Sequence, residues 1–163
     1  MIQVNKYKFE VVDFSGADGG LYTYFVDYLN DFYEGGMDVE IHSSKIERAE
    51  IEWPNFIETS NAFGRLKISK NKLKKAYFFL LGLLYIFFKK QPKKRIINIH
   101  AFDVRLFTIF SIVLLKLKAD YFVLTLHDVT SFRRGDAVSF LNQRLRFCAY
   151  ISNLIVCHSR EAS

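Results

Sequence analysis

Short strand patterns alternate with longer amphipathic helix patterns along almost the whole chain, and this alternation constrains the fold more than any other feature. A strand followed by a helix and a second strand forms a right-handed crossover unit, in which the two strands are parallel. The sequence therefore predicts an α/β fold, with a doubly wound, mostly parallel sheet and helices on both faces. The predicted strands are 7–14, 37–42, 96–99, 121–126 and 154–157, and the predicted helices are 21–34, 70–90, 103–118 and 136–150.

Segment 43–66 has no clear periodicity, and we expect a short strand and a long loop there. A chain of 163 residues, half of them hydrophobic, is long enough to form one domain with a real core. Cys148 and Cys157 have neither a metal-site spacing nor a disulfide framework, so we expect no metal site, no cofactor and a reducing compartment. Residues 1–6 lack the layout of a signal peptide, which predicts a cytoplasmic location.

A glycine-rich loop, Ser-Gly-Ala-Asp-Gly-Gly at 15–20, separates the first predicted strand from the first predicted helix. Glycines allow close approach of a ligand, and the first N–H groups of a helix attract anions. Gly19 and Gly20 are therefore predicted to contact a ligand, although they could simply form a tight turn. The spacing fits neither a dinucleotide-binding loop nor a P-loop, so both classes are disfavoured.

All four histidines, His42, His100, His127 and His158, fall at or just after the end of a predicted strand. Ligands of parallel sheets bind beyond the carboxyl ends of the strands, so these side chains are candidates for binding. His127 could hydrogen-bond a sugar hydroxyl or a phosphate, and the alternative is a polar residue at a strand end. We expect the diglycine and His127 to line one crevice at a single edge of the sheet.

Residues 76–88 carry no charge, and ten of the 23 lysines and arginines lie between residues 67 and 95. At ~1.5 Å per residue this segment is about 20 Å long, too short for a hydrocarbon core of ~30 Å. The helix could pack against the sheet, or it could lie on an anionic membrane surface, and one face could serve each purpose. The basic segment lacks interleaved aromatics on a sheet, so no nucleic acid partner is predicted. The candidate membrane-surface residues are Lys72, Lys74, Lys75, Lys89, Lys90, Lys93 and Lys94.

Four strings occur in an order that resembles the N-terminal half of GT-B glycosyltransferases of the family 4 type. They are GADGGLY at 16–22, INIH at 97–100, TLHD at 125–128 and ISNLIVCHS at 151–159. The resemblance covers nearly the whole chain. It implies that residues 1–163 form a Rossmann-like, acceptor-side domain, and that a C-terminal nucleotide-sugar-binding domain or partner subunit is missing.

The resemblance also implies an activity, the retaining transfer of a hexose from a nucleotide-sugar donor to a glycan or lipid-linked acceptor. By that likeness Gly19 and Gly20 would approach the donor diphosphate or the acceptor, and catalytic His127 would contact the donor sugar. Asp128 and the loop that contains Arg133 would border the acceptor pocket, and His100 matches its expected place. The basic apolar helix would match a membrane-facing element, which places the protein at the inner face of the membrane. Without the second domain the chain is expected to be inactive.

The family also carries a pair of glutamates eight residues apart in its second domain. Glu50 and Glu58 have this spacing but lie in the first half, so we interpret them as solvated loop charges. An alternative function is a non-catalytic α/β binding module that its lysines recruit to membranes. A nucleotide-dependent oxidoreductase is a third class, and the glycine spacing argues against it.

Overall fold

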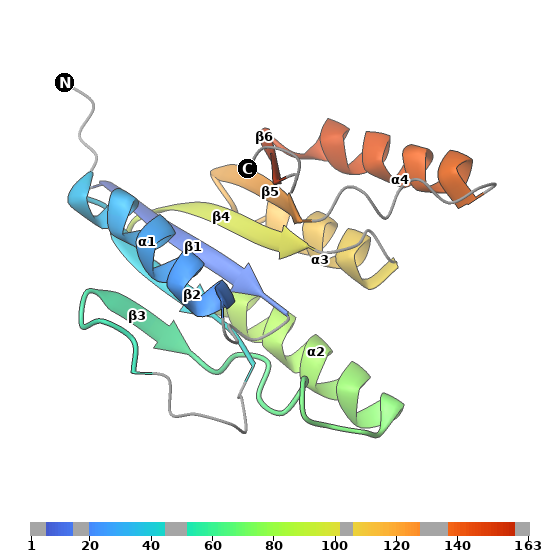
Figure 1. Ribbon diagram of the computed structural model, residues 1–163, viewed down its shortest axis with the longest axis horizontal. Coiled ribbons are helices and arrows are strands. Elements are labelled where there is room, and N and C mark those ends of the chain that lie inside the picture. Colours follow the sequence, from blue (N-terminus) through green and yellow to red (C-terminus); the bar gives the residue numbers. More distant parts are fainter. Residues whose placement is uncertain (1–5, 15–19, 45–51, 102–105, 128–136, 159–163) are drawn as a thin grey trace.

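The computed structural model describes residues 6–14, 20–44, 52–101, 106–127 and 137–158. Within these ranges the chain forms six strands and four helices (Figure 1). The strands are β1 (Tyr7–Asp13), β2 (Asp38–His42), β3 (Ile57–Ser60), β4 (Lys94–Ala101), β5 (Tyr121–His127) and β6 (Leu154–His158). The helices are α1 (Gly20–Glu34), α2 (Lys72–Phe88), α3 (Leu106–Lys116) and α4 (Ala137–Ile151).

All six strands belong to one sheet with the order β3-β2-β1-β4-β5-β6, and every pair of neighbours is parallel. The predicted α/β class with a doubly wound parallel sheet is therefore confirmed. After β1 the chain adds β2 and then β3 on one side of β1. It then crosses over and adds β4, β5 and β6 in turn on the other side. The reversal between β1 and β4 is a topological switch point, where open parallel sheets bind their ligands.

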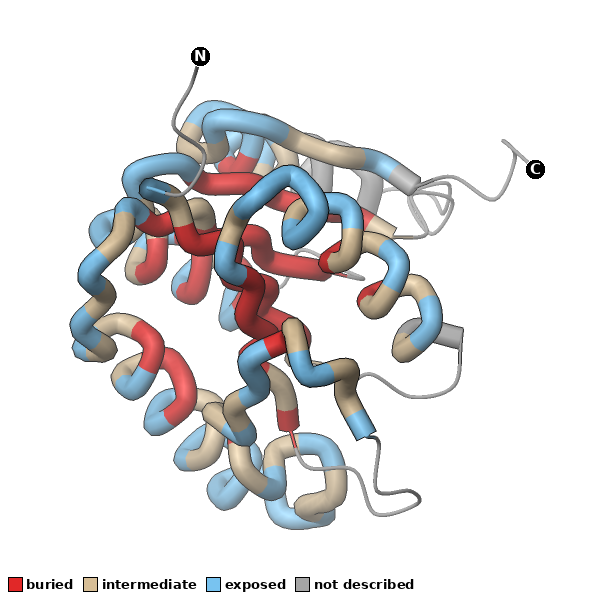
Figure 2. Tube along the Cα trace, turned by 90° about the vertical axis from the view of Figure 1, so that its left-hand side faces the viewer, coloured by how far each residue is buried: buried red, intermediate tan, exposed pale blue. Residues whose placement is uncertain are grey.

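The helices cover the two faces of the sheet unequally. The step from β1 to β2 and the steps from β3 onward run in opposite directions across the sheet, so right-handed crossovers put α1 on one face and α2, α3 and α4 on the other. Figure 1 shows α1 apart from the other three helices. The buried strands lie between these layers (Figure 2).

Each face of the sheet has its own hydrophobic cluster. Phe9 and Val11 of β1 pack with Phe25 and Leu29 of α1, whereas Val12 packs on the side of the three helices. Neighbouring strand residues point to opposite faces, so one short strand supplies both cores. Leu83 of α2, Ile112 of α3 and Cys148 of α4 belong to the second cluster.

The end of α1 has the predicted glycine cap. The Met37 N–H donates to the Phe32 carbonyl at 3.1 Å, and the Gly36 N–H donates to the Tyr33 carbonyl at 2.8 Å. This pair of bonds is a Schellman motif, which requires a left-handed residue at Gly36, and its φ is 83°. The second predicted helix is two residues shorter at each end than expected. At its start Asn71 caps it by accepting from the N–H groups of Leu73 and Lys74, and at its end Lys89 leaves the helical conformation with a ψ of 118°.

Strand β3 lies in segment 43–66, where a short strand was expected without a defined position. Only Ile57 of its four residues is buried, because β3 is the edge strand of the sheet. A four-residue edge strand with one buried apolar side chain has too short a pattern for periodicity to locate it.

Candidate functional site

The predicted ligand-contacting residues follow strands whose carboxyl ends share one edge of the sheet. Gly20 begins α1 directly beyond β1, His100 lies near the end of β4, and His127 is the last residue of β5. Since β4 lies between β1 and β5, the three positions lie along one edge at the switch point. Gly19, Asp128 and Arg133, which were also predicted to bind substrate, lie outside the described residues.

His100 and His127 are in direct contact. The His100 Nδ1 atom lies 2.8 Å from the His127 Nε2 atom, and the ring centroids are 5.1 Å apart. His100 is 1% exposed, whereas His127 is partly exposed. The pair therefore leads from the interior of the sheet to its carboxyl edge.

Three further side chains extend this pair into the protein. The Asn98 amide nitrogen donates to the Tyr28 hydroxyl at 2.8 Å and lies 3.1 Å from the His100 Nε2 atom. The Thr125 hydroxyl donates to the Asn98 amide oxygen at 3.0 Å, which fixes the orientation of the amide. The result is a continuous polar chain Tyr28–Asn98–His100–His127, which we call the histidine relay.

The directions of these hydrogen bonds determine which ring nitrogen of each imidazole carries the proton. The Asn98 N–H group faces His100 Nε2, so that nitrogen accepts and the proton of His100 lies on Nδ1. His100 Nδ1 then donates to His127 Nε2, and neutral His127 holds its own proton on Nδ1. A neutral imidazole held in this form is a fixed hydrogen-bonding group, which suits contact with a sugar or phosphate oxygen.

Two tyrosines of α1, Tyr24 and the relay member Tyr28, pack around the imidazoles. The Tyr24 ring lies edge-on to both imidazoles, with its centroid 5.7 Å from that of His127 and 5.8 Å from that of His100. Burial, and to a lesser degree the neighbouring Tyr24, raises the pKa of Tyr28 to about 12, so its hydroxyl stays neutral. Tyr24 lies one turn beyond Gly20, so the first turns of α1 reach His127, while the common crevice of the diglycine and His127 stays a prediction.

Sequence reasoning missed Tyr24, Tyr28, Asn98 and Thr125. A signal was present, because Asn98 and His100 are two residues apart in one strand, as are Thr125 and His127 in the next. Side chains two apart in a strand lie on one face of the sheet. Two polar pairs in otherwise apolar strands could therefore have indicated a buried polar chain.

His42 does not belong to this site, which corrects the expectation for strand-end histidines. It is fully buried on the opposite face, where its Nε2 atom lies 2.9 Å from Glu10 and its Nδ1 atom 2.7 Å from Ser60. His158 pairs through its backbone with His127 across β5 and β6. The side chain of His158 lies outside the described part of the structure.

His42 is part of a buried ionic network beneath α2. Arg95 donates to both carboxylate oxygens of Glu10 at 2.6 and 2.7 Å, and its third nitrogen donates to the Ile86 carbonyl at 3.1 Å. Burial alone would raise the pKa of Glu10, but hydrogen bonds and charge from His42 and Arg95 bring it to about 2. The network therefore fastens the last turn of α2 to the sheet.

The same network contains Glu40, whose carboxylate pairs with Lys8 at 2.9 Å and with Lys89. Glu10, Glu40 and His42 are close enough together to hold a metal ion. Arginine and lysine side chains already neutralise both carboxylates, so we assign the cluster a structural role. Glu58 was interpreted as a solvated loop charge; its side chain is 62% exposed, as expected, but it lies in strand β3 and not in a loop, and it pairs with Lys8.

The predicted membrane-surface lysines form two groups. Lys72, Lys74 and Lys75 are exposed at the start of α2 and make no salt bridge with any residue of the described ranges. At the other end Lys89 pairs with Glu40 and Lys93 pairs with Asp38 at 2.7 Å. Lys94 lies over the Tyr7 ring, and Lys90 is exposed. Uncompensated positive charge is therefore concentrated at the start of α2.

Large apolar side chains are exposed along α2 and α3, while Gly82, Leu83 and Ile86 of α2 face the core. Segment 76–88 thus packs against the core on one side, as the first alternative predicts, and is exposed on the other, while its place on a membrane surface stays a prediction. No helix in the described ranges is both long enough and apolar enough to cross a bilayer. We call the exposed set the α2–α3 apolar face: Leu73, Tyr77, Leu80, Leu81, Tyr85, Phe88, Leu106, Phe107, Phe110, Val113 and Leu117.

Comparison with protein-family models, with curated protein sequences and with solved structures finds no match. The fold and the site therefore define an α/β domain with a polar edge at its switch point, and function has to be argued from the geometry of that edge.

Proposed function

We propose that this chain is the acceptor-side domain of a glycosyltransferase, which transfers a sugar from a nucleotide-sugar to a glycan or lipid-linked acceptor. The observation that supports it most is the position of His127, which ends the histidine relay at the carboxyl edge beside the switch point. In this proposal His127 contacts the donor sugar, and a separate nucleotide-sugar-binding domain or subunit completes the enzyme.

The chemistry of the edge agrees with sugar binding. His127 is neutral when it accepts from His100, so it is suited to hydrogen bonding and does not need to move protons. Tyr24 adds an aromatic ring within 5.7 Å of that imidazole, and Tyr28 anchors the far end of the relay. Buried hydrogen bonds fix the ring before a ligand arrives, which lowers the entropy cost of binding.

The test is sugar transfer by the chain assembled with its nucleotide-sugar-binding partner. We expect His127→Ala to lower transfer by about a hundredfold or more, as the loss of a transition-state contact does, with the fold intact by circular dichroism. Thr23→Ala is the matched control, since Thr23 is exposed on α1 beside Tyr24. Transfer at the wild-type rate by the His127→Ala protein would remove His127 from the site.

A second function is favoured by a separate observation. The α2–α3 apolar face adjoins the lysines at the start of α2, and apolar surface beside lysines is the pattern of a protein that lies on an anionic membrane. In this proposal the domain is a membrane-recruited binding module. The two functions are compatible, and vesicle binding tests the second one by itself.

A further inference from the structure

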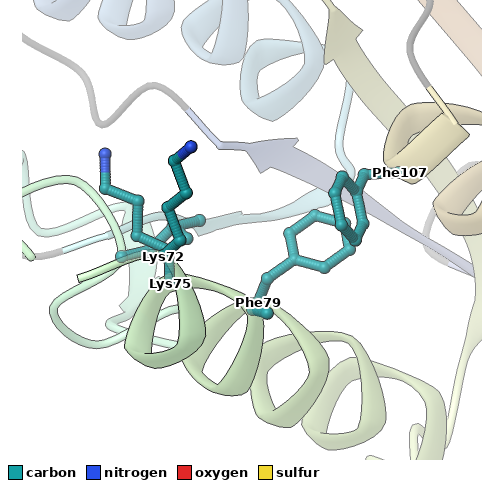
Figure 3. Close-up of a pocket in the computed structure, with 6 residues that line it drawn as sticks. Lys72, Lys75, Phe79 and Phe107 are labelled. Carbon is teal, nitrogen blue, oxygen red and sulfur yellow. The ribbon is translucent and has the colours of Figure 1, made fainter. Parts of the chain in front are cut away.

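A cavity of about 560 Å³ opens between α2, α3 and the segment that precedes α2 (Figure 3). It is lined by Leu66, Lys72, Lys75, Ala76, Phe79 and Phe107. Lys72 begins a helix that follows β3, and Phe107 lies in the first turn of a helix that follows β4. The cavity therefore lies near the carboxyl edge of the sheet, on the face opposite to α1.

Aromatic rings line one end of the cavity, which is therefore apolar and well packed. Phe79 packs edge-on against Phe107, with ring centroids 5.4 Å apart, and it also contacts Phe14 and the fully buried Phe63. Phe107 is nevertheless 62% exposed, so a large apolar ring at this opening faces solvent. A ligand with an apolar part would cover it, with the gain that burial of apolar surface brings.

The other end of the cavity is positively charged. In Figure 3 the ammonium groups of Lys72 and Lys75 extend to one side, away from the rings of Phe79 and Phe107. The first turn of α2 contains no acidic residue, and neither lysine forms a salt bridge within the described ranges. The side chain of Asn71 already accepts from the N–H groups of Leu73 and Lys74, so the lysines and not the helix amides are available to an anion.

We propose that this cavity binds a single-chain lipid that carries a phosphate headgroup. The apolar chain lies on Phe79, Phe107 and Leu66, and the phosphate pairs with Lys72 and Lys75. Because Phe107 belongs both to the cavity and to the α2–α3 apolar face, such a lipid can enter directly from a bilayer. The inference does not depend on sugar transfer, since the cavity and the histidine relay lie on opposite faces of the sheet.

Calorimetric titration of the full chain with decyl phosphate, below its micelle concentration, tests the proposal. We expect one molecule to bind per chain, while inorganic phosphate and decyl maltoside bind at least roughly tenfold more weakly. Ala76→Trp, at an exposed helix position that lines the cavity, should fill it and weaken binding by a similar factor. The double variant Lys72→Gln, Lys75→Gln should also bind roughly tenfold more weakly.

Lys70→Gln is the matched control, since Lys70 is exposed just before α2 but does not line the cavity. Its affinity for decyl phosphate should stay close to that of the wild-type chain. The proposal is overturned if Ala76→Trp binds decyl phosphate as the wild-type chain does. It is equally overturned if inorganic phosphate alone binds as tightly, or if Lys70→Gln weakens binding as much as the double variant Lys72→Gln, Lys75→Gln does.

Discussion

Glu10 is a carboxylate without solvent exposure, and it stays ionised because Arg95 and His42 supply three short hydrogen bonds. Its folded pKa of about 2 lies below the ordinary value of 4.5. A lowered pKa means that the ionised form stabilises the fold. The contribution is complete above about pH 5, and it is lost progressively as the pH falls from 4.5 to 2. The two pKa values put the contribution of the ionised Glu10 to the free energy of unfolding on the order of 3 kcal/mol.

Glu10→Gln should therefore lower the free energy of unfolding at pH 7 by about 3–5 kcal/mol, because it leaves the Arg95 charge buried with a weaker partner. The variant should also lose less stability than the wild-type chain between pH 5 and pH 2. Urea denaturation across this pH range measures both effects. Glu58→Gln is the control, since the Glu58 side chain is 62% exposed and should contribute below about 1 kcal/mol. An equal acid dependence of Glu10→Gln and wild type would contradict this account.

Residue identity alone cannot separate His127 from His42, although both end a strand. His42 is the last residue of β2 and His127 is the last residue of β5, but their side chains lie on opposite faces of the sheet. The face depends on register, and one step along a strand reverses it. The buried pairing of Glu10 with Arg95 joins residues 85 positions apart, so no local sequence pattern reveals it.

Helix α2 packs closely against the core on one side and exposes apolar side chains and lysines on the other. Its buried side is narrow, and at Gly82 it approaches the preceding segment closely. A Cβ atom on Gly82 would lie 2.3 Å from the Phe63 ring and 2.9 Å from the Ala62 carbonyl oxygen. The position of α2 therefore depends on the absence of a side chain at this residue, and Phe63 is held fully buried beneath it.

Gly82→Ala should lower the free energy of unfolding by about 1–3 kcal/mol, as overpacking of a core does. Helix propensity alone would change it by about 1 kcal/mol in the opposite direction, so a net loss shows that the clash dominates. Thermal or urea unfolding of the variant provides the measurement. Leu81→Ala, at the exposed neighbouring residue, should change the stability by less than about 1 kcal/mol. A stabilised Gly82→Ala protein would mean that Phe63 moves aside freely.

Most elements could be predicted from the sequence, because their apolar periodicity is long and their ends carry clear signals, such as Gly35-Gly36 after α1. β3 could not be located, since its pairing with β2 and not its own composition makes it a strand. The site was predicted in part. His100 and His127 are in contact, but Tyr24 reaches them only through the packing of α1 on the sheet.

Across the described residues the molecule is asymmetric, with three helices on one face of the sheet and one on the other. The α2–α3 apolar face and the lysines at the start of α2 belong to the three-helix side. Its most exposed members, Leu73 at 81% and Leu117 at 73%, show that this surface has no cover within the described structure. Contiguous exposed apolar surface of this kind marks a docking face.

The chain should float with vesicles that contain anionic lipid and should not float with purely zwitterionic vesicles. Lys74→Glu should weaken this binding by roughly tenfold, given about 1 kcal/mol per lysine near an anionic surface and a reversal of the charge. Lys6→Glu gives the same change in net charge at the start of β1 and serves as the control. Equal effects of the two substitutions would indicate attraction by net charge alone.

The unequal number of helices on the two faces of the sheet also determines how the domain would be oriented on a membrane. If the three-helix side rests on lipid, one helical layer about 10 Å thick separates the strands from the headgroups. The imidazole pair then faces away from the bilayer beside α1, while the cavity mouth lies near the bilayer. A water-borne donor and a lipid-borne substrate would thus arrive from opposite directions and meet across the rim of a single sheet.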